Sequence, residues 1–173
     1  PEGVLYVDPY SAAGPLADGS ETYPFPTVQQ AVAASFEGYE IRLAAGTYAG
    51  AFLTLNEPGI TLKGAGKDLT LLIVPEELTG IRVEANNITV RDLAIEGGTN
   101  GVTAIGTEGD PITGLRVENV KISNLQGKNG EGETVHGIQV EYATAPVIRL
   151  NHIEALQAGN GQTSSICCNI PGH

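Results

Sequence analysis

The chain has 173 residues and a net charge of −11, with 20 Asp and Glu against 9 Lys and Arg. This length fits one domain with a sizeable core. A surface this acidic repels phosphate backbones, so we expect no nucleic acid partner. No stretch reaches the roughly 18 apolar residues of a membrane span. The absence of Met, with 23 Gly and 10 Pro, favours a processed chain that is secreted, extracellular, at the cell surface or periplasmic.

A short strand, a long ordered loop and one helix are predicted within residues 1–38. Residues 5–7 alternate as a strand does, and the loop that follows is rich in Gly, Pro, Ser and Asp. Thr27 and Gln30 have the spacing of a capping box, which predicts a helix that starts directly after Thr27. Gly38 is expected to end this helix in a left-handed conformation.

Short repeated strands are predicted for residues 39–156, where apolar residues follow a period of two. Similar segments end at Ile95, Ile122 and Ile153, at intervals of roughly 30 residues, which indicates a solenoid. Because every repeat holds short strands, the solenoid is a β-solenoid in which coils stack on one another. Asp and Asn residues are expected at or next to the bends between strands.

The predicted fold class is therefore all-β: a right-handed single-stranded parallel β-helix with one short N-terminal capping helix. The whole chain, 1–173, is expected to form a single β-helix domain. Residues 157–173 are expected to be either an irregular C-terminal tail or the start of further coils. If no cap follows the last coil, its open C-terminal end exposes unpaired backbone groups, which favours a homo-oligomer joined through that end.

One outward column of charged side chains is predicted across successive coils. Lys63, Arg91, Glu118 and Arg149 occupy equivalent positions and should stack along the axis. Glu118 between two Arg residues would relieve their repulsion, so the column is either a salt-bridge ladder or a substrate-binding row. Tyr142 is a further candidate for substrate binding.

The segment 126–136 is the longest insertion between the predicted coils and carries the candidate catalytic groups. His136 or Arg149 could act as the base of a polysaccharide lyase or epimerase. Glu131 and Glu133 could then hold Ca²⁺, which would neutralise a uronate. The competing interpretation is a solvated loop without chemistry.

Two further small groups of residues are candidate sites. Glu108 and Asp110 form an acidic turn that could bind Ca²⁺, although the turn does not have the ligand spacing of an EF-hand loop. Cys167 and Cys168 are adjacent, so each is expected to pair elsewhere or to remain a free thiol, because a ring between neighbours is strained.

The segment from Tyr6 to Ile95 resembles the opening of pectin-lyase-like proteins. The matching stretches are residues 27–32, 41–48 (with Ala-Ala-Gly-Thr-Tyr), 59–66 (Gly-Ile-Thr-Leu-Lys-Gly-Ala-Gly) and 87–95. The opening is similar to that of pectin methylesterases, but their paired-Asp motifs have no counterpart in this sequence. The resemblance implies a β-helix and leaves the activity open, since this frame serves enzymes and non-catalytic surface proteins alike.

Three functions are compatible with these observations. The first is a non-catalytic secreted or surface domain that binds polysaccharide or builds a scaffold. The second is a lyase or epimerase that acts on acidic glycans through the segment 126–136. The third is a filament subunit that stacks end to end through its open end.

Overall fold

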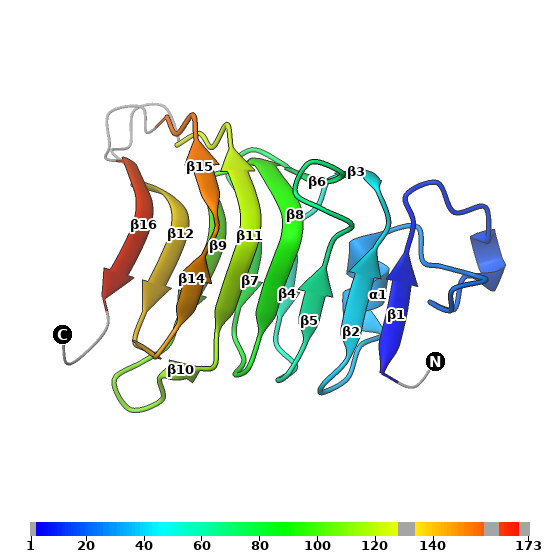
Figure 1. Ribbon diagram of the computed structural model, residues 1–173, viewed down its shortest axis with the longest axis horizontal. Coiled ribbons are helices and arrows are strands. Elements are labelled where there is room, and N and C mark those ends of the chain that lie inside the picture. The colour runs from blue at the N-terminus through cyan, green and yellow to red at the C-terminus, as the bar shows by residue number, and fades with distance from the viewer. Residues whose placement is uncertain (1–2, 128–133, 158–162, 170–173) are drawn as a thin grey trace.

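The computed structural model describes residues 3–127, 134–157 and 163–169, with only the backbone for Ser164, Cys168 and Asn169. Its strands pair in parallel with the strands of the preceding and following coils. The chain rises along the side nearer the viewer and descends behind it while it advances from right to left, which makes the helix right-handed (Figure 1). The predicted fold class, a right-handed parallel β-helix, is therefore confirmed.

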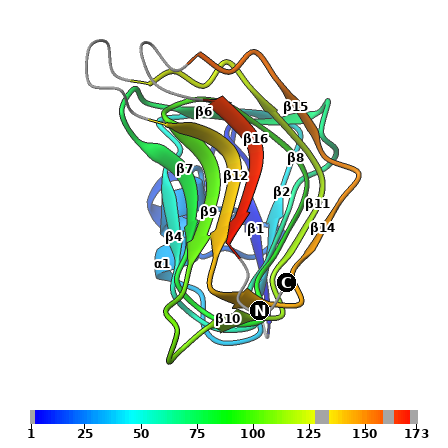
Figure 2. The ribbon, with the colours of Figure 1, turned by 90° about the vertical axis from the view of Figure 1, so that its left-hand side faces the viewer.

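Each coil has three faces, which we name the front, upper and rear faces from their places in Figure 1; Figure 2 shows them end on. The front face consists of β1 (Val4–Val7), β2 (Glu40–Leu43), β5 (Thr61–Lys63), the first halves of β8 (Thr89–Gly97) and β11 (Arg116–Ser123), and β14 (Val147–Arg149). The upper face consists of β3 (Gly46–Ala49), β6 (Thr70–Val74), the second halves of β8 and β11, and β15 (His152–Glu154).

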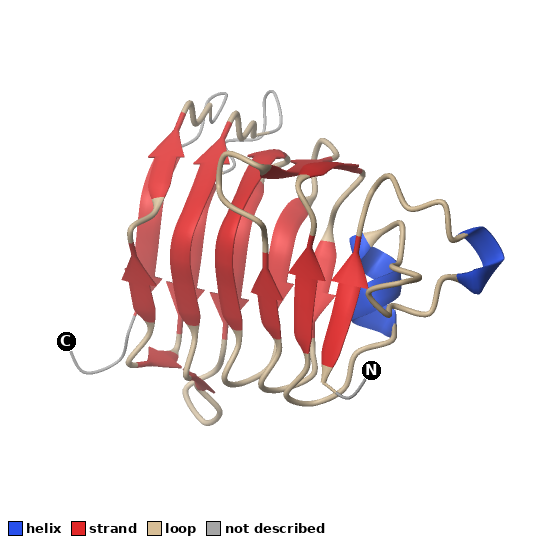
Figure 3. Cartoon of the chain, turned by 45° about the vertical axis from the view of Figure 1, so that its right-hand side comes forward, coloured by secondary structure: helices blue, strands red, loops and turns tan. Residues whose placement is uncertain are grey.

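The rear face consists of β4 (Leu53–Leu55), β7 (Thr79–Val83), β9 (Asn100–Ile105), β12 (Val135–Glu141) and β16 (Thr163–Asn169). A small pair, β10 (Ile112–Thr113) and β13 (Ala143–Thr144), closes the turn below. Figure 3 shows these strands as parallel layers, with the helical segments gathered at the N-terminal end. One of these is the 3-10 turn η1 (Gly14–Leu16) in the long loop after β1.

The short helix α1 (Val28–Ala33) starts where the capping box predicts. The Thr27 hydroxyl accepts the Gln30 amide N–H at 3.4 Å and donates to Gln30 Oε1 at 2.9 Å. The helix packs beside β4 and β1 and so covers the core at the N-terminal end of the rear face. The prediction that Gly38 ends the helix was wrong: Ala34 is the C-cap, and Gly38, with a φ of 78°, turns the chain toward β2.

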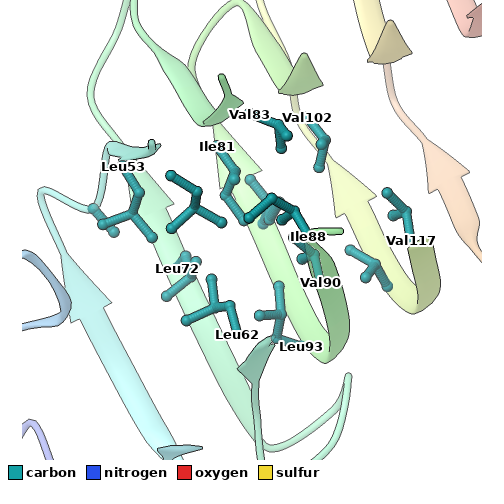
Figure 4. Packing of buried hydrophobic residues seen from close by; sticks show 14 of the residues in the cluster. Leu53, Leu62, Leu72, Ile81, Val83, Ile88, Val90, Leu93, Val102 and Val117 are labelled. Atoms are coloured by element: carbon teal, nitrogen blue, oxygen red, sulfur yellow. The ribbon is translucent and has the colours of Figure 1, made fainter. Parts of the chain in front are cut away.

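The core is built from columns of inward side chains that stack from coil to coil. On the front face, one such column consists of Leu5, Ile41, Leu62, Val90 and Val117, all of them buried. Figure 4 shows how inward side chains from the three faces meet around the axis. No coil encloses its own core, so the stability of the helix comes from the contacts between coils.

The bend between the front and upper faces is held by residues in the left-handed conformation. Asp92, Asn119 and Leu150 have φ values of 57°, 53° and 59°. The Asn119 amide donates to Asp92 Oδ1 at 2.8 Å, which links two coils at this bend. Asn151 lies one residue beyond the bend, where its Oδ1 accepts the Val120 N–H at 2.9 Å. The expected Asp and Asn residues are thus found at the bend or next to it.

The corner between the upper and rear faces has room for one side chain per coil, an isoleucine, and for none on the residue opposite it. Three glycines there face three isoleucines: Gly80 faces Ile95, Gly101 faces Ile122, and Gly137 faces Ile153. A Cβ atom on Gly101 would lie 2.5 Å from the carbonyl oxygen of Gly137 and 2.8 Å from Ile122 Cγ2. The repeated glycines and isoleucines of the sequence therefore reflect one packing contact per coil.

The last coil differs from those before it in how far its apolar side chains are exposed. β16 pairs in parallel with β12, so residues 163–169 form the rear strand of a further coil. Ile166 has the register position of the fully buried Ile138, yet 46% of it is exposed. Ile153 on β15 is likewise only partly buried. Within the described residues, no helix is long and apolar enough to cross a membrane.

Candidate functional site

The outer side of the rear face carries a column of side chains that can form hydrogen bonds. Thr54, Arg82, Thr103 and Gln139 are register partners on β4, β7, β9 and β12. They point outward because their neighbours along each strand, such as Ile81 and Val83, are buried in the core. The fold therefore presents one polar side chain per coil along this face.

A groove of about 310 Å³ is formed on this column. Its lining includes Thr79, Arg82, Glu84, Asn100, Thr103, Ile105 and Gln139. Thr103 is only 6% exposed, and its hydroxyl makes no hydrogen bond with any residue that the structure describes. The hydroxyl oxygen is open to the groove, because among the described residues the buried side-chain atom without a partner is His136 Nδ1, so a ligand in the groove would replace water at this hydroxyl.

The walls of the groove offer both donors and acceptors. The Arg82 guanidinium lies 3.9 Å from the Glu84 carboxylate, a distance too long for a hydrogen bond. Gln139 uses its Nε2 to reach Glu141 at 2.6 Å, which leaves its amide oxygen available. Ile105, 52% exposed, adds an apolar surface to the rim.

A second hollow of about 320 Å³ adjoins the groove at the N-terminal end of the same face, between α1 and β4. Its lining includes Gln29, Phe52, Thr54 and Asn56. The Phe52 ring is 50% exposed and offers a flat apolar surface among these polar groups. Because Thr54 directly precedes Arg82 in the column, the two hollows follow one another along the axis.

On the front face, Lys63, Arg91, Glu118 and Arg149 lie in one outward column, as the spacing of the repeats predicts. The column is longer than expected, because Arg42 and Tyr6 continue it toward the N-terminus. The Arg42 guanidinium lies 5.6 Å from the centre of the Tyr6 ring and donates to the Tyr6 hydroxyl at 3.2 Å. A second outward column runs beside it and contains Arg116.

The ion pairs of the front face differ from the expected ladder. Glu118 pairs with Arg149 at 2.9 Å and with Arg116 at 3.0 Å, whereas Arg91 pairs with Asp92 at 2.6 Å. Glu118 lies between Arg91 and Arg149 in the column, as predicted, and its charge contributes to the raised pKa of Arg91, although its direct ion pairs are with Arg149 and Arg116. Hydrogen bonding to Arg149 and the charge of Arg116 outweigh burial and hold the pKa of Glu118 below its ordinary value.

The structure does not bring the candidate catalytic groups together. His136 lies on β12 of the rear face and Arg149 on β14 of the front face, on opposite sides of the helix (Figure 2). Burial lowers the pKa of His136 against the opposing charge of Glu141. Its Nδ1 is buried without a partner among the described residues. Tyr142 follows β12 at a φ of 48°, at the turn toward β13, and lies outside the front column.

The candidate metal ligands that the structure describes lie apart from the central columns of the front and rear faces, whereas Cys167 continues the rear column. Glu108 and Asp110 are exposed in a turn, where the Asp110 N–H donates to Thr107 Oγ1 at 3.1 Å. In the part of the chain that the structure describes, no three His, Cys, Asp or Glu side chains gather as metal ligands do. Glu131 and Glu133 lie outside that part, so the calcium prediction for them remains open. Cys167 is a free, half-buried thiol in register with Gln139, and the side chain of Cys168 is outside the description.

The repeats of the sequence also contain a signal for the rear groove, which the sequence analysis above does not use. The segments that begin at Gly80, Gly101 and Gly137 repeat a small residue followed by alternating apolar positions. The position between the two apolar residues of each repeat is occupied by Arg82, Thr103 and Gln139. Reading this outward position across the repeats gives the polar column of the groove.

Comparison with known proteins identifies the family. Residues 13–171 match the family described as "Protein of unknown function (DUF1565)". The chain belongs to this family. No curated protein matches the sequence of this DUF1565 member at a significant level.

Two solved structures are similar to this DUF1565 chain. One is a mutant pectin methylesterase in complex with a hexasaccharide, with 13% identity and a TM-score of 0.46. The other is a pectin methylesterase from Erwinia chrysanthemi, with 14% identity and a TM-score of 0.46. In both cases the similarity covers 87% of this chain and 60% of the other, so the chain spans about three fifths of the length of these enzymes.

Proposed function

We propose that this protein is a non-catalytic β-helix domain that acts outside the cell, where it binds a polysaccharide in the groove of the rear face. The observation that carries the proposal is the Thr103 hydroxyl, which lies at the floor of the groove without a hydrogen-bond partner in the described part of the chain. The hydroxyl group of a bound sugar would form a hydrogen bond with this Thr103 hydroxyl.

The composition of the groove supports a ligand rich in hydroxyl groups. A sugar presents donors and acceptors close together beside apolar C–H surface. The groove offers the Arg82 guanidinium and the Gln139 amide oxygen beside the apolar side chain of Ile105. The adjoining hollow with Phe52 extends this surface along the axis, which suits a polymer better than a single small molecule.

The same lining favours binding over hydrolysis. Glycosidases use a pair of carboxyl groups that flank the bond to be cleaved. Among the described residues that line the groove, Glu84 is the one carboxylate, and its nearest charged group is the Arg82 guanidinium. This pairing of opposite charges leaves the groove close to neutral.

The proposal is tested with Thr103→Val, which replaces the hydroxyl by a methyl group of similar size. A glycan array identifies a binding sugar, and calorimetry then measures its affinity for the wild type and the variant. We expect the affinity to fall about tenfold, as for the loss of one buried hydrogen bond, while the free energy of unfolding stays equal or rises. Thr47→Val, on the exposed side of β3, is the matched control and should leave the affinity unchanged.

Two results would contradict this proposal. The first is an array on which no glycan binds. The second is a Thr103→Val variant that binds as tightly as the wild type.

A second candidate function, a lyase or epimerase on acidic glycans, is favoured by one observation. The backbone N–H of His136 donates to Asn100 Oδ1 at 2.9 Å, so this histidine borders a residue of the groove. The lowered pKa of its imidazole leaves it unprotonated at neutral pH, as a general base must be. Incubation with polygalacturonate and alginate, with and without Ca²⁺, tests this function. If the wild type forms a product and His136→Ala does not, this result would support the lyase or epimerase function over binding alone.

A further inference from the structure

The front face concentrates positive charge on an acidic protein. Five of the 9 Lys and Arg residues of the chain lie in its two outward columns: Arg42, Lys63, Arg91, Arg116 and Arg149. The acids that pair with them are Glu40, Asp92 and Glu118. Five positive against three negative charges give this surface a net charge of +2, although the chain as a whole carries −11.

The charges of this column are balanced at one end and unbalanced at the other. Toward the C-terminus, Glu118 alternates with cations and pairs with two of them. Toward the N-terminus, Arg42, Lys63 and Arg91 follow one another on three adjacent strands without an acid between them. Like charges directly opposite each other across strands are destabilising.

Lys63 is the centre of this unbalanced run. Arg42 is paired with Glu40 and Arg91 with Asp92, whereas Lys63 makes no ion pair with any residue in the described ranges. Its two neighbours in the column are both cations and repel it, and the acid whose charge acts on Lys63, Asp92, is already paired with Arg91. An external anion bound at Lys63 would remove this repulsion.

The two neighbouring arginines are held in position for the same ligand. The guanidinium of Arg91 is fixed by Asp92 at 2.6 Å, and that of Arg42 by Glu40 and the Tyr6 hydroxyl. A guanidinium has five N–H donors, so each arginine keeps donors free for an anion after these contacts. Such fixed donors lose little side-chain entropy when a ligand binds.

We propose that this front column is a second binding site, which holds a linear polysaccharide with an anionic group on successive sugars. Because the cations stack along the helix axis, the polymer lies along that axis and across the strands. Adjacent strands are about 4.8 Å apart, so the column from Tyr6 to Arg149 is roughly 24 Å long and meets several sugars at once. The site is independent of the rear groove, which lies on the opposite face and is close to neutral.

The test is binding of polygalacturonate to Lys63→Gln, compared with Lys67→Gln as the control that removes the same charge outside the column. We expect Lys63→Gln to weaken binding about threefold, since an exposed charge contributes below about 1 kcal/mol. It should also unfold at an equal or higher temperature than the wild type, because the repulsion with Arg42 and Arg91 is gone. Lys67→Gln should bind as the wild type does.

Further ligands identify the chemistry that is recognised. Dextran, which is neutral, should not bind to this column, and binding of polygalacturonate should weaken as the salt concentration rises. Heparin binding in addition would show that sulfate serves as well as carboxylate. Lys63→Gln should leave the binding of a neutral glycan found on the array intact, which separates this site from the rear groove.

Three outcomes would overturn the proposal: no binding of polygalacturonate or heparin, binding that Lys63→Gln leaves unchanged, or binding that Lys67→Gln weakens to the same extent. Weaker binding by Lys63→Gln together with a lower unfolding temperature would also count against it, because Lys63 would then stabilise the fold rather than oppose it.

Discussion

At the scale of single residues, the contact between Gly101 and Ile122 shows what the repeats in the sequence encode. Ile122 belongs to the repeats that predict the coils. The repeats do not show that it contacts Gly101, because this contact joins two faces that are separated by a turn. The corner excludes any side chain at position 101, and the isoleucine fills the space that the glycine leaves.

Gly101→Ala should therefore destabilise the protein by about 1–3 kcal/mol, as expected for an extra methyl group in a tightly packed core. The new Cβ would approach the Gly137 carbonyl oxygen to 2.5 Å, and both atoms belong to strands that cannot separate without loss of pairing. Urea unfolding measures the effect. Gly109→Ala, where a Cβ meets nothing within 4 Å, is the control and should change stability by less than about 0.5 kcal/mol. Equal stability of the two variants would contradict this account of the corner.

At the scale of elements, strand register was predictable and the pairing of side chains was not. The spacing of the repeats placed Lys63, Arg91, Glu118 and Arg149 in one column, because a parallel coil repeats each position on the next strand. Which acid each arginine would contact depends on the left-handed bend at Asp92, which brings that carboxylate to the Arg91 guanidinium. No periodic pattern in a sequence carries that geometry.

The pairing of Glu118 with Arg149 and Arg116 should make the front face sensitive to acid. The folded protein holds the pKa of Glu118 below its ordinary value of 4.5, so its contribution to stability is complete above that value. The contribution is lost as the pH falls through the lowered pKa, because the folded state then takes up a proton and the ion pairs break.

Urea midpoints at about pH 7 and about pH 3 measure this loss. In Glu118→Gln the carboxylate is absent at both values, so the difference between the two midpoints should be smaller than in the wild type. Glu108→Gln, in an exposed turn, is the control and should show the wild-type difference. A Glu118→Gln variant with an unchanged difference would show that these ion pairs do not contribute to stability.

At the scale of the whole molecule, the two ends of the helix differ. α1 covers the core at the first coil, whereas Ile166 on the last described strand is 46% exposed at an inward register position. The sequence predicts the capping helix, whereas for residues 157–173 it leaves open an irregular tail or the start of further coils. An exposed parallel edge with apolar side chains favours pairing with another chain.

We expect the molar mass in solution to rise with protein concentration, as measured by light scattering. Ile166→Asp should reduce this rise by placing a charge at the open end, whereas Ile73→Asp, on the lateral surface of β6, should not. A constant monomer mass for the wild type would contradict self-association. If adding reductant abolishes the rise, the link between chains is a disulfide at Cys167 or Cys168 instead.

The direction of the hydrogen bonds in this fold has a mechanical consequence. Bonds between parallel strands point along the axis, and from the second coil on each interface between coils contains such bonds on all three faces. A pull on the two ends of the molecule therefore loads every interface in series, with all the bonds of one interface sharing the force. The weakest interface opens first and opens as a unit, so under tension the protein should lengthen in discrete steps, each one releasing the chain of a single coil.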